Sequence, residues 1–139
     1  MKIISVIPAR GNSKSIPLKN LAKLKKKPLI YYTIKKSLKC KIIDRTIVST
    51  DSKLIAEIAK KYGAEAPFLR PKNLSKDSSK DIGFLKHLLK WLKKNENYRP
   101  DLIVQLRPTN PLRNQKLIKK AIQLMKKNKS ADSLRSISL

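Results

Sequence analysis

Short apolar runs alternate along this chain with longer segments in which apolar residues recur every three or four positions. The runs are rich in isoleucine and valine and are typical of buried strands, whereas the longer segments are typical of amphipathic helices. Pro28 suits a first helical position, and Gly63 is placed to end the second helix. The expected strands span residues 2–8, 44–49, 65–69, 101–106 and 131–137, and the expected helices span 28–39, 51–62, 80–94 and 114–127.

Strict alternation of strands and helices predicts an α/β fold with a mostly parallel sheet between two layers of helices. We expect one domain, residues 1–139, because the chain has room for a single core. In such sheets ligands bind beyond the carboxyl ends of the strands. The side chains expected to face the sheet are Leu29, Ile30, Ile34, Leu38, Leu54, Ile55, Ile58, Ala59, Ile82, Leu85, Leu89, Leu92, Leu117, Ile118, Ala121, Ile122 and Met125.

The charge of the chain raises the question of nucleic-acid binding. Lys and Arg number 34 against 9 acidic residues, which gives a net charge of +25, and basic surfaces attract phosphate. However, 27 of these residues are Lys and 7 are Arg, and aromatic residues make up 5%. Proteins that bind nucleic acids depend on bidentate arginine contacts and on aromatic side chains that stack on bases. We therefore expect a lysine-rich surface, with a basic nucleic-acid-binding domain as the alternative.

The cysteine content and the hydropathy predict a soluble, cytoplasmic protein. Cys40 is the single cysteine, which excludes an internal disulfide and a multi-cysteine metal cluster. No apolar stretch approaches the roughly 20 residues that cross a bilayer, and the N-terminus lacks the features of a signal peptide. His87 has no second histidine with which to form a metal pair or a triad. We expect His87, Trp91 and Cys40 to be packing residues.

The loop after the first strand holds a cluster of cations. Residues 7–20 read IPARGNSKSIPLKN, in which Arg10, Lys14 and Lys19 lie within ten residues of a strand's carboxyl end. Such a loop can wrap a polyphosphate with backbone N–H groups and fixed positive charges. It is neither a GxxxxGK[ST] loop nor a GxGxxG loop. From charge alone, a solvated basic loop is an equally good interpretation.

The pattern of this loop resembles the amino-terminal signature of the acylneuraminate cytidylyltransferases, the CMP-sialic acid synthetase family. Members show a pattern like I-P-A-R-G-x-S-K-G-I-P-x-K-N after their first strand. Ser15 stands here where the family usually has Gly. The matching residues are Ile7, Pro8, Ala9, Arg10, Gly11, Ser13, Lys14, Ile16, Pro17, Lys19 and Asn20.

Three later segments are similar to the same family, in the expected order. Residues 47–52 (IVSTDS) resemble its V-S-T-D-S segment, in which Asp51 has either a helix-capping or a ligand role. Residues 67–79 resemble its R-P-x-x-L-x-x-D-x-S segment. Residues 106–113 (LRPTNPLR) resemble its L-R-P-T-S-P-L-R segment. Enzymes that make CMP-Kdo carry a Q-G-D-E-P-like segment at that last place, so the sequence argues against that activity.

The resemblance implies a Rossmann-like nucleotide-diphospho-sugar transferase fold and a defined reaction. A nine-carbon 2-keto sugar acid (sialic, legionaminic or pseudaminic) would react with CTP to give the CMP-sugar and pyrophosphate, with Mg²⁺ as cofactor. It also implies a homodimer in the full-length form, and that this chain matches the first part of a family member, without the late acidic pair that holds the metal. An inactive nucleotide-binding fragment is the alternative. The implied catalytic residues are Arg10 and Lys19, and the implied substrate-binding residues are Ala9, Lys14, Asn20, Arg70, Ser79, Asp81 and Arg107.

Overall fold

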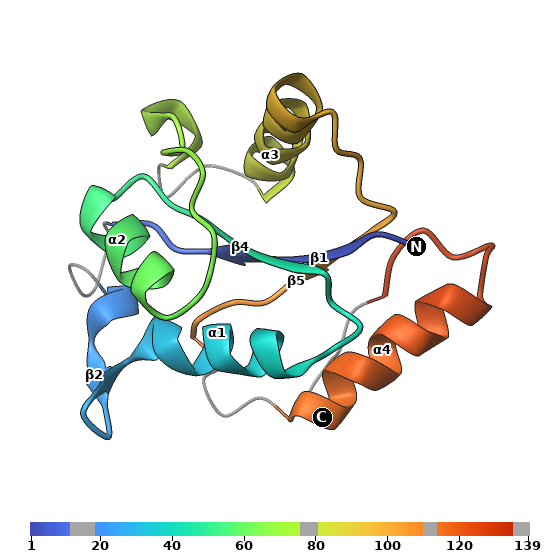
Figure 1. The fold of residues 1–139 in the computed structure, drawn as a ribbon, viewed down its shortest axis with the longest axis horizontal. Coiled ribbons are helices and arrows are strands. Elements are labelled where there is room, and N and C mark those ends of the chain that lie inside the picture. Colours follow the sequence, from blue (N-terminus) through green and yellow to red (C-terminus); the bar gives the residue numbers. More distant parts are fainter. Residues whose placement is uncertain (12–18, 76–80, 110–113, 135–139) are drawn as a thin grey trace.

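The central sheet of the protein is parallel. The computed structural model describes residues 1–11, 19–75, 81–109 and 114–134. In these residues, β1 (Ile3–Pro8) lies between β4 (Arg45–Ser49) and β5 (Leu102–Gln105) (Figure 1). Val6 pairs with Ile47 on one side and with Gln105 on the other. Because helices cover both faces, the middle strand is apolar at almost every position, as is usual for parallel sheets.

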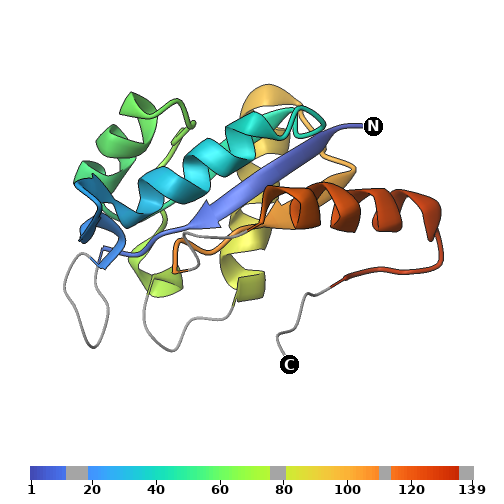
Figure 2. The ribbon, with the colours of Figure 1, turned by 90° about the horizontal axis from the view of Figure 1, so that it is seen from below.

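Helices on the two faces of the sheet confirm the predicted three-layer α/β/α arrangement. One face packs on α1 (Leu29–Lys39), α2 (Lys53–Lys61) and α4 (Gln115–Lys127). The other face packs on α3 (Asp81–Glu96), which Figure 1 shows on the opposite side of the strands. Alternate β1 residues divide between the two cores, with Ile3 and Ile7 in the first and Ile4 and Val6 in the second. In Figure 2, α1 and α4 both lie along β1.

Small residues, rather than some of the predicted leucines, face the sheet. In α1, Thr33 and Ser37 are buried beside Ile30 and Ile34. The Ser37 hydroxyl lies 2.6 Å from the hydroxyls of both Ser5 and Thr46, so a polar contact joins α1 to β1 and β4. The predicted stripes are wrong at Leu38, Leu54, Ile82, Leu89 and Leu117, which are exposed. In α3 the large side chains of Phe84 and Leu88 are buried in their place.

The ends of the helices follow local capping chemistry. The Ser52 hydroxyl accepts a hydrogen bond from the Ile55 N–H at 3.2 Å and so begins α2. The Asn114 side chain accepts one from the Lys116 N–H at 2.9 Å and begins α4. Gly63 follows α2 with a φ of +101°, a left-handed conformation that glycine adopts without strain. The prediction that Gly63 ends this helix is confirmed.

The predicted strand at residues 65–69 is wrong. This segment makes two isolated parallel bridges with the edge strand, at Glu65 and at Leu69. Pro67 lies between them and has no N–H with which to continue the ladder. The segment is instead fixed by side chains, since the Arg45 guanidinium donates two hydrogen bonds to the Glu65 carboxylate at 2.6 and 2.9 Å. These two carboxylate contacts raise the pKa of Arg45 further above its ordinary value.

The predicted strand after α4 is also wrong over residues 131–134. The chain turns there, and the Ala131 N–H donates to the Asn128 carbonyl at 3.1 Å. Residues 135–137 of the expected strand lie outside the described residues. The bend follows directly from the end of α4, because Asn128 accepts from Ala131 instead of starting an extended segment.

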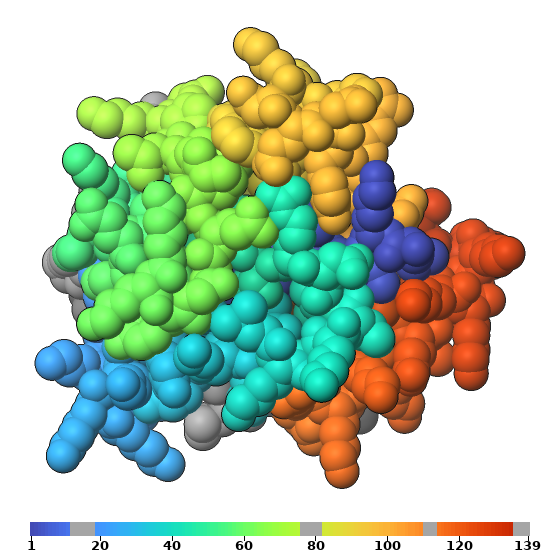
Figure 3. All heavy atoms as spheres, viewed as in Figure 1, coloured from blue at the N-terminus to red at the C-terminus, as the bar shows by residue number. Residues whose placement is uncertain are grey.

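A small hairpin between β1 and α1 was not predicted. It consists of β2 (Lys23–Leu24) and β3 (Lys27–Pro28), and follows a short 3₁₀ helix, η1 (Lys19–Leu21). Lys25 and Lys26 form the turn with φ values of +50° and +69°. Figure 3 shows the side chains of this blue segment projecting from the surface. A second 3₁₀ helix, η2 (Lys72–Leu74), precedes α3.

Candidate nucleotide site

Three loops meet at the carboxyl edge of the parallel sheet. In Figure 2, β1 points toward the side of the molecule where residues 19–28 lie. Ala9 is buried directly after β1, and its N–H donates to the Ser49 carbonyl at the end of β4 at 2.9 Å. The Leu106 N–H donates to the Val6 carbonyl at 3.0 Å and continues the pairing of β5 with β1. The segments after β1, β4 and β5 therefore begin side by side.

The peptide group between Arg10 and Gly11 is hydrogen-bonded on both sides. Its carbonyl oxygen accepts from Asn20 Nδ2 at 2.9 Å, and its N–H donates to Asp51 Oδ1 at 2.7 Å. Asp51 follows β4, and Asn20 lies in η1. Of the two roles expected for Asp51, helix capping is wrong, because Ser52 caps α2 and the Asp51 carboxylate binds the loop after β1.

Two of the predicted phosphate ligands lie at this edge. Arg10 and Lys19 are both half-buried, and Asn20 beside Lys19 contacts the Arg10 carbonyl. The structure therefore brings the two ends of the basic loop together. Lys14, the third predicted cation, lies outside the described residues.

Arg70 is buried, with 5% of its surface exposed, beside the end of β4. Its Nη2 donates to the Ser49 carbonyl at 2.7 Å and its Nε to the Ser49 hydroxyl at 3.1 Å. Its guanidinium carbon lies 4.5 Å from the centre of the Phe84 ring on α3. The Arg70 backbone N–H also donates to the Thr50 carbonyl at 2.7 Å. Arg70 thus joins the segment before α3 to the strand end that also binds Ala9.

His87 on α3 lies near Arg70 and remains a packing residue, as expected. Its ring is 4.8 Å from that of Phe68 in an edge-to-face contact. Among the described residues, no group hydrogen-bonds its buried Nδ1. Burial, followed by the positive charge of Arg70, lowers the pKa of His87 below its ordinary value. A neutral imidazole adds no second positive charge beside Arg70. Trp91 and Cys40 also pack in the cores.

For the other predicted substrate-binding residues, the structure describes Arg107 fully, Asp81 by its backbone alone and Ser79 not at all. Arg107 is exposed and follows Leu106, so it leaves β5 beside the start of the loop after β1. Asp81 is the first residue of α3, and its side chain lies outside the description. Ser79 also lies outside the described residues. The structure therefore places Ala9, Arg10, Lys19, Asn20, Arg70 and Arg107 at or next to one edge.

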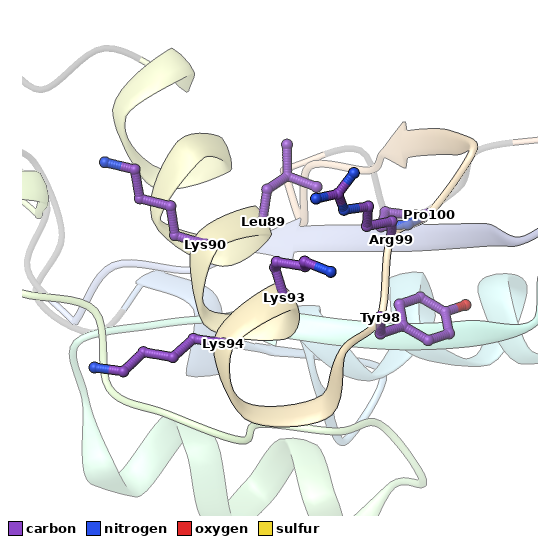
Figure 4. Close-up of a pocket in the computed structure, with 7 residues that line it drawn as sticks. All are labelled: Leu89, Lys90, Lys93, Lys94, Tyr98, Arg99 and Pro100. Carbon is purple, nitrogen blue, oxygen red and sulfur yellow. The ribbon is translucent and has the colours of Figure 1, made fainter.

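A hollow that the structure describes lies elsewhere. It has a volume of about 610 Å³ and lies between the second half of α3 and the segment before β5, at the amino edge of the sheet. Figure 4 shows Lys90 and Lys94 extending to the side of α3 away from Tyr98 and Arg99. We call it the cationic hollow; it is lined by Leu89, Lys90, Lys93, Lys94, Tyr98, Arg99 and Pro100.

Neither a metal centre nor a membrane span is found in the described part of the chain. Within residues 1–11, 19–75, 81–109 and 114–134, no three His, Cys, Asp or Glu side chains form a group that could hold a metal ion. Asp51 is an acid at the carboxyl edge, and its Oδ1 binds the Gly11 N–H. In the same residues, no helix combines the length and the apolar character needed to span a bilayer.

Sequence reasoning missed Ser49 and the Asp51–Gly11 contact. Both depend on the parallel register, which sets Pro8 beside Ser49 across about forty residues of chain. The pairing of a carboxylate with a glycine N–H has no signature in a single sequence. The matching segments at residues 7–20 and 47–52 were the signals available.

Comparisons with known proteins identify the fold and the family of the chain. The parallel sheet of order β4-β1-β5 with helices on both faces defines a Rossmann-like fold. A solved CMP:2-keto-3-deoxy-manno-octonic acid synthetase complexed with CTP aligns with a TM-score of 0.75 at 22% identity, over 94% of this chain and 49% of that one, which shows the fold. The family described as Cytidylyltransferase matches residues 4–137, and the chain belongs to it.

Two curated relatives are 40% identical to the chain. One is the pseudaminic acid cytidylyltransferase of Campylobacter jejuni subsp. jejuni serotype O:2, aligned over 94% of this chain and 56% of the relative. The other is the CMP-N,N'-diacetyllegionaminic acid synthase of Legionella pneumophila, aligned over 100% of this chain and 60% of the relative. The chain thus spans a little over half the length of these relatives.

Proposed function

We propose that the carboxyl edge of this sheet binds CTP, for transfer of its CMP group to a nine-carbon 2-keto sugar acid. The observation that carries the proposal is the fixed Arg10–Gly11 peptide, next to Lys19 and Asn20, in a chain of the cytidylyltransferase family. Fixed cations and backbone groups at a strand end are suited to a triphosphate. The relatives' names, pseudaminic acid cytidylyltransferase and CMP-N,N'-diacetyllegionaminic acid synthase, support the sugar-acid class.

The proposed roles follow from side-chain chemistry. Arg10 and Lys19 neutralise the triphosphate, with Lys19 nearer the reacting α-phosphate. The Asn20 amide holds the Arg10 carbonyl with one N–H and has further polar atoms for a ribose hydroxyl. The Arg107 guanidinium is exposed after β5, and its fork matches the carboxylate of a sugar acid. Ala9 shapes the loop, Lys14 adds a cation, and Arg70, Ser79 and Asp81 form the cytosine side.

The proposed reaction is a phosphoryl transfer in which the protein positions the reactants and neutralises charge. The oxygen of the sugar acid's anomeric hydroxyl forms a bond to the α-phosphorus of CTP, the bond to the β-phosphate oxygen breaks, and pyrophosphate leaves with that electron pair. The proton of the hydroxyl is lost to solvent or to a base. Cations fixed before the reaction stabilise the charge that develops on the leaving group without reorganising.

The family is consistent with a divalent cation, and we propose Mg²⁺. Among the described residues, no three His, Cys, Asp or Glu side chains form a group that could hold the ion. We further propose that residues 1–139 form one nucleotide-binding domain, that the protein acts in the cytoplasm, and that its full-length form is a homodimer.

The test is nucleotide selectivity in thermal unfolding. At equal concentrations, CTP should raise the melting temperature of this chain more than ATP, GTP or UTP, because a ligand that binds only the native state stabilises it by mass action. At about 100 times its dissociation constant, CTP should contribute about 2.7 kcal/mol. Sodium triphosphate is the control for charge alone.

Equal shifts with all four nucleotides and with triphosphate would reject a cytosine site and leave only phosphate attraction. Stabilisation by duplex DNA that falls steeply with salt, without a CTP effect, would favour the basic nucleic-acid-binding alternative. CTP binding without CMP-sugar formation would favour the alternative of a nucleotide-binding fragment.

A further inference from the structure

The Asp51 carboxylate fixes the peptide group on which the basic loop begins. The Gly11 N–H donates to Asp51 Oδ1 at 2.7 Å, a short distance typical of a hydrogen bond to a charged acceptor. The carbonyl of the same peptide accepts from Asn20 at 2.9 Å. With both polar atoms of the group held, its plane cannot rotate without breaking a hydrogen bond. The direction in which the chain leaves Arg10 is therefore set by Asp51 and Asn20 together.

Gly11 allows this contact by its lack of a side chain. A Cβ atom at Gly11 would lie 3.1 Å from the Ser52 Cβ and 3.4 Å from Asp51 Oδ1. The first of these distances is shorter than an ordinary contact between carbon atoms. The loop after β1 and the loop after β4 thus approach each other closely, and a larger residue at position 11 would have to displace the Ser52 side chain by a few tenths of an ångström. Close approach of the backbone, rather than an unusual φ angle, is the reason for a glycine here.

The local structure around Asp51 does not need its carboxylate. Helix α2 begins on the Ser52 hydroxyl, which accepts from the Ile55 N–H. The Ser52 N–H in turn donates to the Thr50 hydroxyl at 3.1 Å. The one hydrogen bond described for the Asp51 side chain crosses forty residues of sequence to the basic loop. The carboxylate therefore serves the loop after β1 rather than its own helix.

We propose that Asp51 is a positioning residue for the triphosphate-binding loop, acting through the Gly11 N–H as a hydrogen-bond acceptor. The inference rests on the proposed function, since it assigns Asp51 a part in CTP binding. A loop that is ordered before the nucleotide arrives loses less conformational entropy on binding. Asp51 fixes the backbone of Arg10 and Gly11, and so holds the start of the loop in place before CTP binds.

Two substitutions separate an acceptor role from a charge role. In Asp51→Asn the amide oxygen can still accept from the Gly11 N–H, although the negative charge is gone. In Asp51→Ala both the acceptor and the charge are gone. If Asp51 acts by its charge, for example on a cation bound with the nucleotide, the two variants should be equally impaired. If it acts as an acceptor, the asparagine variant should retain most of the wild-type behaviour.

The experiment measures hydrogen exchange of the Gly11 amide by NMR and CTP affinity by calorimetry on the same samples. In Asp51→Ala we expect the Gly11 amide to exchange at least about tenfold faster than in the wild type. We expect CTP to bind about tenfold more weakly, the scale of one lost hydrogen bond to a charged group. Asp51→Asn should stay within about threefold of wild type in both measurements.

Asp101→Ala is the matched control. The Asp101 carboxylate accepts from the Lys2 N–H at 2.6 Å, a contact of the same kind at the opposite edge of the sheet. This variant should leave both the Gly11 exchange rate and the CTP affinity unchanged. If Asp51→Ala and Asp101→Ala changed the Gly11 exchange rate and the CTP affinity equally, Asp51 would act only through the general stability of the fold. That result would overturn the proposal.

Unchanged Gly11 exchange in Asp51→Ala would also overturn the proposal, as would an asparagine variant as impaired in CTP binding as the alanine variant. If Asp51→Ala does not fold, the Asp51→Asn variant decides. A protected Gly11 amide and a CTP affinity close to that of the wild type would support the proposal, and loss of either would overturn it. If the wild type protects the Gly11 amide but does not bind CTP, the proposed function fails. That outcome differs from failure of the contact itself, which the exchange rate reports without any nucleotide.

Discussion

Replacing Arg70 with methionine should lower the free energy of unfolding by about 3 kcal/mol. The guanidinium is buried and donates to two oxygens of Ser49, which would lose these hydrogen bonds. A hydrogen bond from a charged group contributes about 1.5–3 kcal/mol, and the cation above the Phe84 ring adds to the loss, whereas the Ser49 carbonyl keeps the Ala9 N–H as a donor. Arg70→Lys should lose less than the methionine variant, because it keeps the charge without the planar fork. Urea unfolding measures all three proteins.

Arg99→Met is the control for the Arg70 prediction. Arg99 is exposed beside the cationic hollow, so its replacement should change the unfolding free energy by less than about 0.5 kcal/mol. If Arg70→Met and Arg99→Met had the same stability, the buried contacts of Arg70 would contribute nothing. Arg70 would then not hold the end of β4.

Replacing Arg10 or Lys19 with alanine should weaken CTP binding by about 1–3 kcal/mol each, which is roughly a tenfold to hundredfold rise in the dissociation constant. Arg10 belongs to the fixed Arg10–Gly11 peptide, and Lys19 precedes Asn20, which binds that peptide. Both residues are half-buried, so their charges are less screened than those of exposed lysines. Titration calorimetry with CTP measures the change. Unfolding curves without nucleotide should be nearly the same for both variants and the wild type.

The matched control removes two lysines at the other end of the molecule. Lys126 and Lys127 are exposed in the last turn of α4. The double alanine variant removes two charges and should change CTP affinity by less than about threefold. A loss as large as that of the Arg10 and Lys19 variants would mean that the net charge of +25, rather than a particular loop, attracts the nucleotide.

The alternation of strands and helices was enough to predict the layers of the fold and most element boundaries. This prediction succeeds because each helix of this chain has one apolar face and each parallel strand is buried. It failed at residues 65–69, where Pro67 breaks a ladder that the apolar residues favour. It also failed at the β2–β3 turn, since Lys25 and Lys26 have positive φ values that are usual for Asn and Gly.

The candidate site was only partly predictable. The motif at residues 7–20 pointed to Arg10, Lys19 and Asn20, and the ligand was expected beyond the carboxyl ends of the strands. Which side chains hold those loops depends on the register of β1 against β4, a contact between distant residues. Ser49 and Asp51 therefore became visible only in the structure.

The most direct test of the account is an amide-resolved NMR titration of this chain with CTP. If the carboxyl edge binds CTP, chemical-shift changes should concentrate there, on residues 9–11, 19–21, 49–52 and 106–107, and should saturate with one nucleotide per chain. UTP at the same concentrations should produce smaller changes at these positions. Changes concentrated on the cationic hollow at Lys93 and Arg99, or spread evenly over the lysine-rich surface, would contradict the account.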